Sequence, residues 1–134
     1  MPETESTTHV TGIGRVMVPV TDQDRAIEFY TEKLGFEKNA DVPFGDGNRW
    51  VEVIAGGNAD VAIALVQPRP DDPIGIDTHI ALTTGDADAA HEALRSAGVD
   101  VDDEVSRMGG PVPPMFWLRD QDGNTLMLVE SQDS

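Results

Sequence analysis

Residues 116–130 read FWLRDQDGNTLMLVE, a stretch in which two apolar runs flank a short polar turn. The turn contains Asp, Gly and Asn, which tolerate the left-handed backbone that tight hairpin turns require. The stretch therefore predicts a β-hairpin. This hairpin closes the second of two similar halves, so it fixes how the rest of the chain is divided.

The elements expected before the hairpin occur twice in the same order. Apolar residues at alternate positions predict strands, and apolar residues three and four apart predict helices. Pro19 favours a strand end or an edge strand, because proline donates no hydrogen bond to a sheet. Thr21 or Asp22 starts the first helix and Gly35 ends it. The expected elements are a strand at 13–20, a helix at 21–35, strands at 36–42, 49–55 and 60–67 with turns at 43–48 and 56–58, and then a strand at 77–84, a helix at 86–98, a strand at 99–105 and the closing hairpin.

The two halves align with each other. Arg15 falls on His79 and Asp22 on Asp86 at one constant offset, and Leu65 falls on Leu128 after a one-residue indel. We therefore predict an α+β fold of two tandem β-α-β-β-β modules, whose sheets curve around a central cleft. The expected divisions of this single domain are a flexible arm at 1–11, a first module at 12–67, a linker at 68–76 and a second module at 77–131.

Composition and charge exclude several classes of protein. The 134 residues include no cysteine, which rules out disulfides, thiol catalysis and cysteine metal sites. A formal net charge of −16 repels nucleic acid and anionic membranes. The acidic N-terminus is no secretory leader and no window is long and apolar enough to cross a membrane, so we expect a cytoplasmic protein. The acidity fits a salt-loving organism or, alternatively, an ordinary acidic protein of a mesophile.

Three motifs resemble the vicinal oxygen chelate superfamily, which includes glyoxalase I, bleomycin-resistance proteins and extradiol dioxygenases. Residues 26–36 resemble its motif A-x-x-F-Y-x-x-x-L-G-F, residues 78–82 its second opening strand, and residues 119–124 its motif R-D-P-D-G-N. The resemblance covers about residues 12–131. It implies the glyoxalase-like fold, a small-molecule cleft and a homodimer.

Enzymes of that superfamily bind a divalent metal through one residue from each of four strands. By resemblance, these positions fall on Arg15, Ala64, His79 and Met127. His79 can ligate a metal, but arginine has no acceptor, alanine has no donor atom and the methionine thioether is a soft, weak ligand. We therefore predict no metal at these positions and no cofactor. A divalent metal would require a relocated site.

Strand alternation places a further set of side chains on the cleft-facing side of the sheets. An apolar wall with a few polar groups is typical of small-molecule pockets, and Arg15 could bind a ligand carboxylate through two hydrogen bonds. We expect a planar or apolar ligand. The predicted ligand-binding residues are Arg15, Met17, Trp50, Ala64, His79, Met115, Trp117 and Met127.

Each of these residues also has a purely structural interpretation. Arg15 could pair with an acid such as Glu52 or Glu130, His79 could be a hydrogen-bonded core residue, and the methionines and tryptophans could fill the core. Glu52 is either a cleft carboxylate or a solvated acid of the outer face. Residues 107–114 form either a flap over the cleft or a simple connection.

Two functions remain open at this level. One is a metal-free protein that holds a small apolar or aromatic molecule, as the resemblance to the bleomycin-resistance branch implies. That branch binds its ligand across a dimer interface and attracts a cationic drug with an acidic surface. The other is an enzyme of lyase, isomerase or dioxygenase type, with metal-free chemistry or a relocated metal site around His79. The expected partners are a small molecule and a second copy of the chain, not nucleic acid or a membrane.

Overall fold

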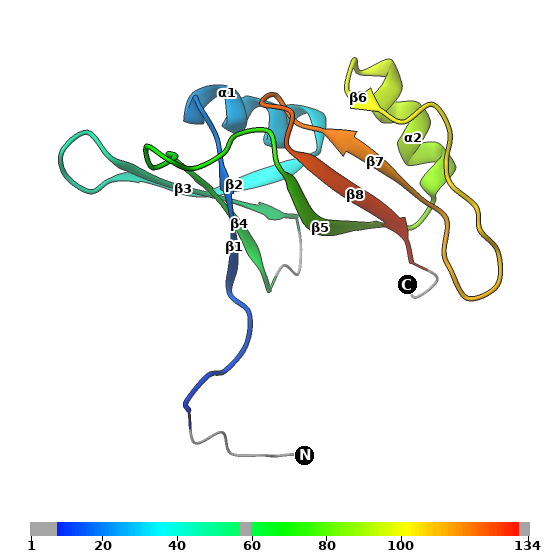
Figure 1. Ribbon diagram of the computed structural model, residues 1–134, viewed down its shortest axis with the longest axis horizontal. Helices are drawn as coiled ribbons and strands as arrows, with labels where there is room; N and C mark the ends of the chain where they lie inside the picture. The colour runs from blue at the N-terminus through cyan, green and yellow to red at the C-terminus, as the bar shows by residue number, and fades with distance from the viewer. Residues whose placement is uncertain (1–7, 57–59, 132–134) are drawn as a thin grey trace.

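Two modules of the same design make up the computed structural model, which describes residues 8–56 and 60–131 (Figure 1). The first contains β1 (Arg15–Pro19), α1 (Gln23–Glu28), the π-helical turn η1 (Phe29–Lys33), β2 (Phe36–Pro43), β3 (Arg49–Ala55) and β4 (Ala62–Val66). The second contains β5 (Asp77–Thr84), α2 (Ala87–Ser96), β6 (Asp100–Val101), β7 (Met115–Arg119) and β8 (Thr125–Glu130).

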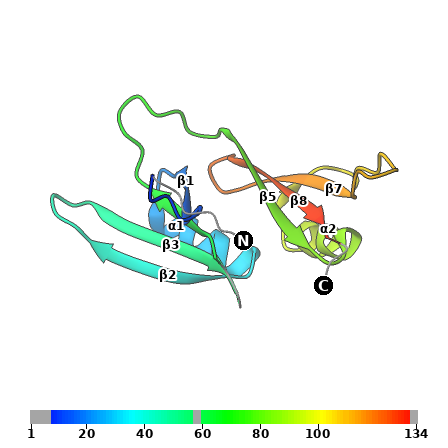
Figure 2. The same cartoon turned by 90° about the horizontal axis from the view of Figure 1, so that it is seen from below.

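Each module forms its own four-stranded mixed sheet. The strand orders are β1-β4-β3-β2 and β5-β8-β7-β6, and the first strand of each module runs parallel to the last. The predicted α+β fold of two tandem modules is confirmed. Figure 2 shows the two sheets lying apart, with the segment between β4 and β5 crossing from one to the other.

The two helices start in the same way, as the internal alignment predicts. The side chain of Asp22 accepts a hydrogen bond from the Arg25 backbone N–H, and the side chain of Asp86 accepts one from Ala89. These carboxylates satisfy backbone donors that a helix start leaves unpaired. Among the described residues, no helix is long and apolar enough to span a membrane.

One face of each sheet packs under its helix to form the core. Val18, Val51, Val53 and Leu65 of the first sheet are fully buried together with Tyr30. In the second module, Phe116, Leu118 and Leu126 are buried with Leu94 of α2. Because side chains alternate along a strand, the residues between these point to the opposite faces of the two sheets.

The prediction of a strand at 99–105 is largely wrong, because β6 comprises only Asp100–Val101. The residues that follow are acidic. The Asp102 backbone N–H still donates to the Trp117 carbonyl, but the Trp117 N–H donates to the Asp102 carboxylate, which also accepts from Arg119, and regular pairing ends there. Residues 107–114, expected to be either a flap or a simple connection, contain an antiparallel bridge between Gly109 and Val112. The expected arm at 1–11 lies mostly, and the turn at 56–58 partly, outside the described residues.

Candidate ligand-binding site

The face of the first sheet that points away from α1 carries four of the predicted site residues. Ala64 pairs with Met17 of β1 on one side and with Glu52 of β3 on the other. Cross-strand neighbours point to the same side of a sheet. We call this surface the first-sheet face and define it by Arg15, Met17, Trp50, Glu52 and Ala64.

Glu52 is the polar centre of the first-sheet face. Its Oε2 accepts hydrogen bonds from Arg15 Nε at 2.5 Å and from the Trp50 indole Nε1 at 2.6 Å, and its Oε1 accepts one from Asn39 Nδ2 at 3.2 Å. Arg15 first, and Trp50 after it, lower the pKa of Glu52, so the carboxylate is ionised at neutral pH. The residue is only 4% exposed.

These contacts decide two of the alternatives. Arg15 does pair with an acid, and that acid is Glu52. The interpretation of Glu52 as a solvated outer-face acid is wrong, because three donors enclose its carboxylate. Arg15 makes this pair through Nε alone, and its side chain remains 52% exposed. Its two terminal nitrogens have no described partner and can donate to another molecule.

A cavity of about 430 Å³ opens beside this face. Met17, which is 54% exposed, and Trp50 form one wall. The opposite wall is the segment that the sequence predicts to be only a linker. The lining residues are Met17, Pro19, Trp50, Val66, Gln67, Arg69, Asp72, Pro73 and Ile76.

Local hydrogen bonds hold the linker wall in place. Gln67 Oε1 accepts from the Arg49 backbone N–H at 3.1 Å, and Asp72 Oδ2 accepts from the Arg69 backbone N–H at 2.8 Å. Proline-rich segments are stiff because each ring fixes one backbone angle. The prolines at 68, 70 and 73 were therefore an available signal for a rigid wall, although sequence reasoning assigned no site residue there.

The second sheet presents a similar apolar surface on the side away from α2. Trp117 pairs with Met127 and Met115 with Val129, and all of them alternate with buried core residues. We call this surface the second-sheet face and define it by Met115, Trp117 and Met127. None of its three residues lines the cavity beside Met17 and Trp50.

His79 lies in neither group. Its side chain is 84% exposed, and its backbone has φ +59° where the β5–β8 pairing breaks between Asp77 and Ala81. The interpretation of His79 as a core histidine is therefore wrong. The residue lines a cavity of about 370 Å³ together with Val16 and Ile63, which point to the opposite side of the first sheet from Arg15.

Ala64 also differs from the other predicted ligand-binding residues. It is fully buried in the first sheet, between the neighbouring strands that carry Met17 and Glu52. A ligand on the first-sheet face would contact its neighbours and not its methyl group. Arg15, Met17 and Trp50 remain the accessible members of the predicted set on this sheet.

The residues at the four superfamily positions do not fit a divalent metal. Arg15 has no acceptor and is bound to Glu52, and Ala64 has no donor atom. Zinc and similar ions require three or more protein ligands. Within residues 8–56 and 60–131, no three His, Cys, Asp or Glu side chains lie close enough together to hold a metal.

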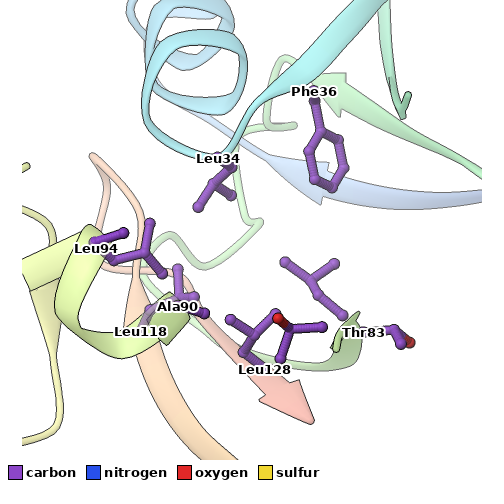
Figure 3. A pocket seen from close by; sticks show the side chains of 10 residues that line it. Leu34, Phe36, Thr83, Ala90, Leu94, Leu118 and Leu128 are labelled. Carbon is purple, nitrogen blue, oxygen red and sulfur yellow. The ribbon is translucent and has the colours of Figure 1, made fainter. Parts of the chain in front are cut away.

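A further cavity of about 280 Å³ lies between the modules (Figure 3). Leu34 and Phe36 reach it from the first module, and Leu94 and Leu128 from the second. Its lining includes only two hydroxyl side chains, Thr83 and Thr84, and no charged group. This cavity therefore lacks the charged side chains, Arg15 and Glu52, that the first-sheet face carries.

Comparisons with known proteins agree with this architecture. The family model of the Glyoxalase/Bleomycin resistance protein/Dioxygenase superfamily matches residues 12–128. The chain belongs to this superfamily. YurT of Bacillus subtilis (strain 168), an uncharacterized protein, is 34% identical over 120 residues, which is 83% of this chain and 92% of YurT.

Two solved structures give the same result. TnmS3, an antibiotic binding protein from Streptomyces sp. CB03234, is 34% identical with a TM-score of 0.79, and the match covers 92% of this chain and 98% of TnmS3. A superfamily member from Sphaerobacter thermophilus is 32% identical with a TM-score of 0.83, and the match covers 91% and 98% of the two chains.

Proposed function

We propose that this protein binds a small, largely apolar or aromatic molecule at the first-sheet face, without a metal. The observation that carries the proposal is the cavity of about 430 Å³ beside Met17 and Trp50, with the donor nitrogens of Arg15 at the same face. Cavities of this size that combine apolar walls with a few polar groups are typical of small-molecule sites. The similarity to TnmS3, which is described as an antibiotic binding protein, supports the same class of function.

We further propose that a second copy of the chain completes the site. Apart from His79, the predicted ligand-binding residues lie on the first-sheet face and the second-sheet face, which belong to different sheets of one chain. In a two-fold dimer that brings the second-sheet face of one copy opposite the first-sheet face of the other, the same contact occurs twice, so both sites are completed. Met115, Trp117 and Met127 would then close the cavity from the partner side.

Thermal-shift screening with a panel of aromatic compounds tests the proposal, with two matched methionine variants. Met17→Glu places a charge on the cavity wall and should abolish the stabilisation by any compound that binds wild-type protein. Met108→Glu makes the same change at a residue that is 70% exposed and does not line this cavity, and binding should be retained. Compounds that stabilise wild-type protein and Met17→Glu equally would contradict the proposed location.

A further inference from the structure

Glu52 is a buried acid that the proposed site does not require for contact with a ligand. Its carboxylate lies on the ligand side of the sheet, yet it is enclosed by Arg15, Trp50 and Asn39. Burying a carboxylate is unfavourable unless charge and hydrogen bonds compensate. All three donors come from different positions on the same face, so the carboxylate organises that face.

The shared oxygen of Glu52 fixes two ligand-facing groups at once. Oε2 accepts from both Arg15 Nε and Trp50 Nε1, which sets the orientation of the guanidinium plane and of the indole ring relative to each other. Trp50 lies two residues before Glu52 on β3, so strand alternation places both on the same side. The indole ring of Trp50 and the guanidinium of Arg15 are therefore held in one relative orientation without a ligand.

These hydrogen bonds determine which polar groups are still available to bind a ligand. Glu52 is 4% exposed and already accepts three hydrogen bonds, so it offers no accessible acceptor. The terminal nitrogens of Arg15 are donors without a described partner. On the linker wall, Asp72 Oδ2 accepts from Arg69 and Gln67 Oε1 accepts from Arg49. Asp72 Oδ1 is an acceptor without a described partner, and the Gln67 amide nitrogen and the terminal nitrogens of Arg69 are donors without one. The polar groups still free at this face are thus mainly donors.

We propose that Glu52 is a positioning residue that makes the site select aromatic ligands with a hydrogen-bond acceptor, a carbonyl or a carboxylate, over aromatic cations. This inference rests on the proposed function of the first-sheet face. It predicts the opposite preference from the one that a net charge of −16 alone would give, since the acidic surface attracts cations. The lowered pKa of Glu52 agrees with an ionised partner for Arg15 at neutral pH.

Four probes that share the naphthalene ring test this selectivity. They are naphthalene without an acceptor, the neutral ketone 2-acetylnaphthalene, the anion 2-naphthoate and the cation 2-naphthylmethylammonium. Titrations followed by calorimetry in about 0.5 M KCl suppress the long-range attraction of cations to the acidic surface. For wild-type protein we expect the ketone to bind about tenfold more tightly than naphthalene, and the cation to bind most weakly.

Variants that change the charge at this face then distinguish a role in ligand selectivity from a role in stability alone. In Arg15→Met, Glu52 keeps Trp50 and Asn39 but loses its counter-charge, so the ketone should weaken about tenfold while the cation strengthens. In Glu52→Gln, Arg15 and Trp50 are held less firmly, so the ketone should lose most of its advantage over naphthalene. The uncompensated charge of Arg15 should at the same time strengthen 2-naphthoate and weaken the cation further. Arg107→Met removes an exposed arginine that pairs with Asp88 in the second module, and it should leave the order of the four probes unchanged.

Opposite-signed changes for oppositely charged probes cannot come from a partly unfolded variant, and the near-UV circular dichroism of each variant checks its fold. If wild-type protein binds the probes but Arg15→Met and Glu52→Gln leave the four affinities unchanged, the role of Glu52 is wrong and the proposed function stands. If the cation is the tightest ligand of wild-type protein, the inference is also overturned. If none of the four probes binds wild-type protein, both the inference and the proposed function fail.

Discussion

The hydroxyl of Tyr30 donates a hydrogen bond of 2.8 Å to Oδ2 of Asp120, which joins the first helical segment to the hairpin turn of the second module. Asp120 also accepts the backbone N–H groups of Asp122 and Asn124 through Oδ1. Asn124 in turn donates to the carbonyl of Pro19. The hairpin turn of the second module is thus also a point at which hydrogen bonds join the two halves.

Replacing Tyr30 with phenylalanine should loosen this junction. Tyr30→Phe retains the ring, which makes edge contacts with Phe29 and Phe36, but removes the donor to a buried carboxylate. We expect a loss of about 1–3 kcal/mol in the free energy of unfolding, measured by urea denaturation. An unchanged unfolding midpoint would mean that the hydroxyl contributes nothing to the junction.

Alkaline pH should destabilise the wild-type protein through the same residue. Burial, and after it the charge of Asp120, raise the pKa of Tyr30 far above its ordinary value of 10.0. A folded-state pKa above the unfolded one gives a contribution that is complete below about pH 10 and is lost as the pH rises further. Unfolding midpoints should fall more steeply above about pH 10 in wild-type protein than in Tyr30→Phe. Equal slopes would show that Tyr30 ionises as freely in the fold as outside it.

Acidic pH should remove the contribution of Asp41 to the free energy of unfolding. Two hydrogen bonds from Arg49 lower the pKa of Asp41 from 3.8 to about 2. A lowered pKa stabilises the fold above the unfolded value, and this stabilisation disappears as the pH falls from about 4 to about 2. Asp41→Asn should therefore be less stable than wild type at neutral pH, with a difference that shrinks over this range. Asp46→Asn, at the exposed β2–β3 turn, serves as the control, and a similar pH-dependent difference there would contradict this assignment.

Salt should stabilise the protein. The net charge of −16 produces self-repulsion in the folded state, and added ions screen it. We expect the Tm to rise steadily with KCl, and to rise more than for a neutral protein of similar size. A Tm that is flat or falls with KCl would exclude adaptation to a salt-rich cytoplasm.

Strand alternation was enough to predict which residues share the first-sheet face, because the period of two depends only on backbone geometry. Alternation does not reveal how enclosed a side chain is, so the central place of Glu52 was missed. A bulge in β2 between Lys38 and Ala40 lies at Asn39, which donates to Glu52, and the sequence carries no signal for it.

His79 shows a different limit. A strand was correctly predicted at 77–84, but a left-handed backbone at a non-glycine residue breaks the alternation at His79 itself. The internal duplication still gave the two modules, Asp86 and one of two candidates, Asp22, as the helix caps, and the order of the elements along the chain. What it could not give is which surfaces of the two modules face each other, because that depends on contacts between residues far apart in the sequence.

Mixing two inactive variants tests the central claim most directly. Met17→Glu disables the first-sheet face and Met127→Glu disables the second-sheet face, so each variant alone should bind no ligand that the panel identifies. If each site combines faces from two chains, a refolded equal mixture contains mixed dimers with one intact site each, and binding should return to about a quarter of the wild-type sites. No recovery in mixed dimers of demonstrated two-chain composition would show that the site is not shared between copies in this way.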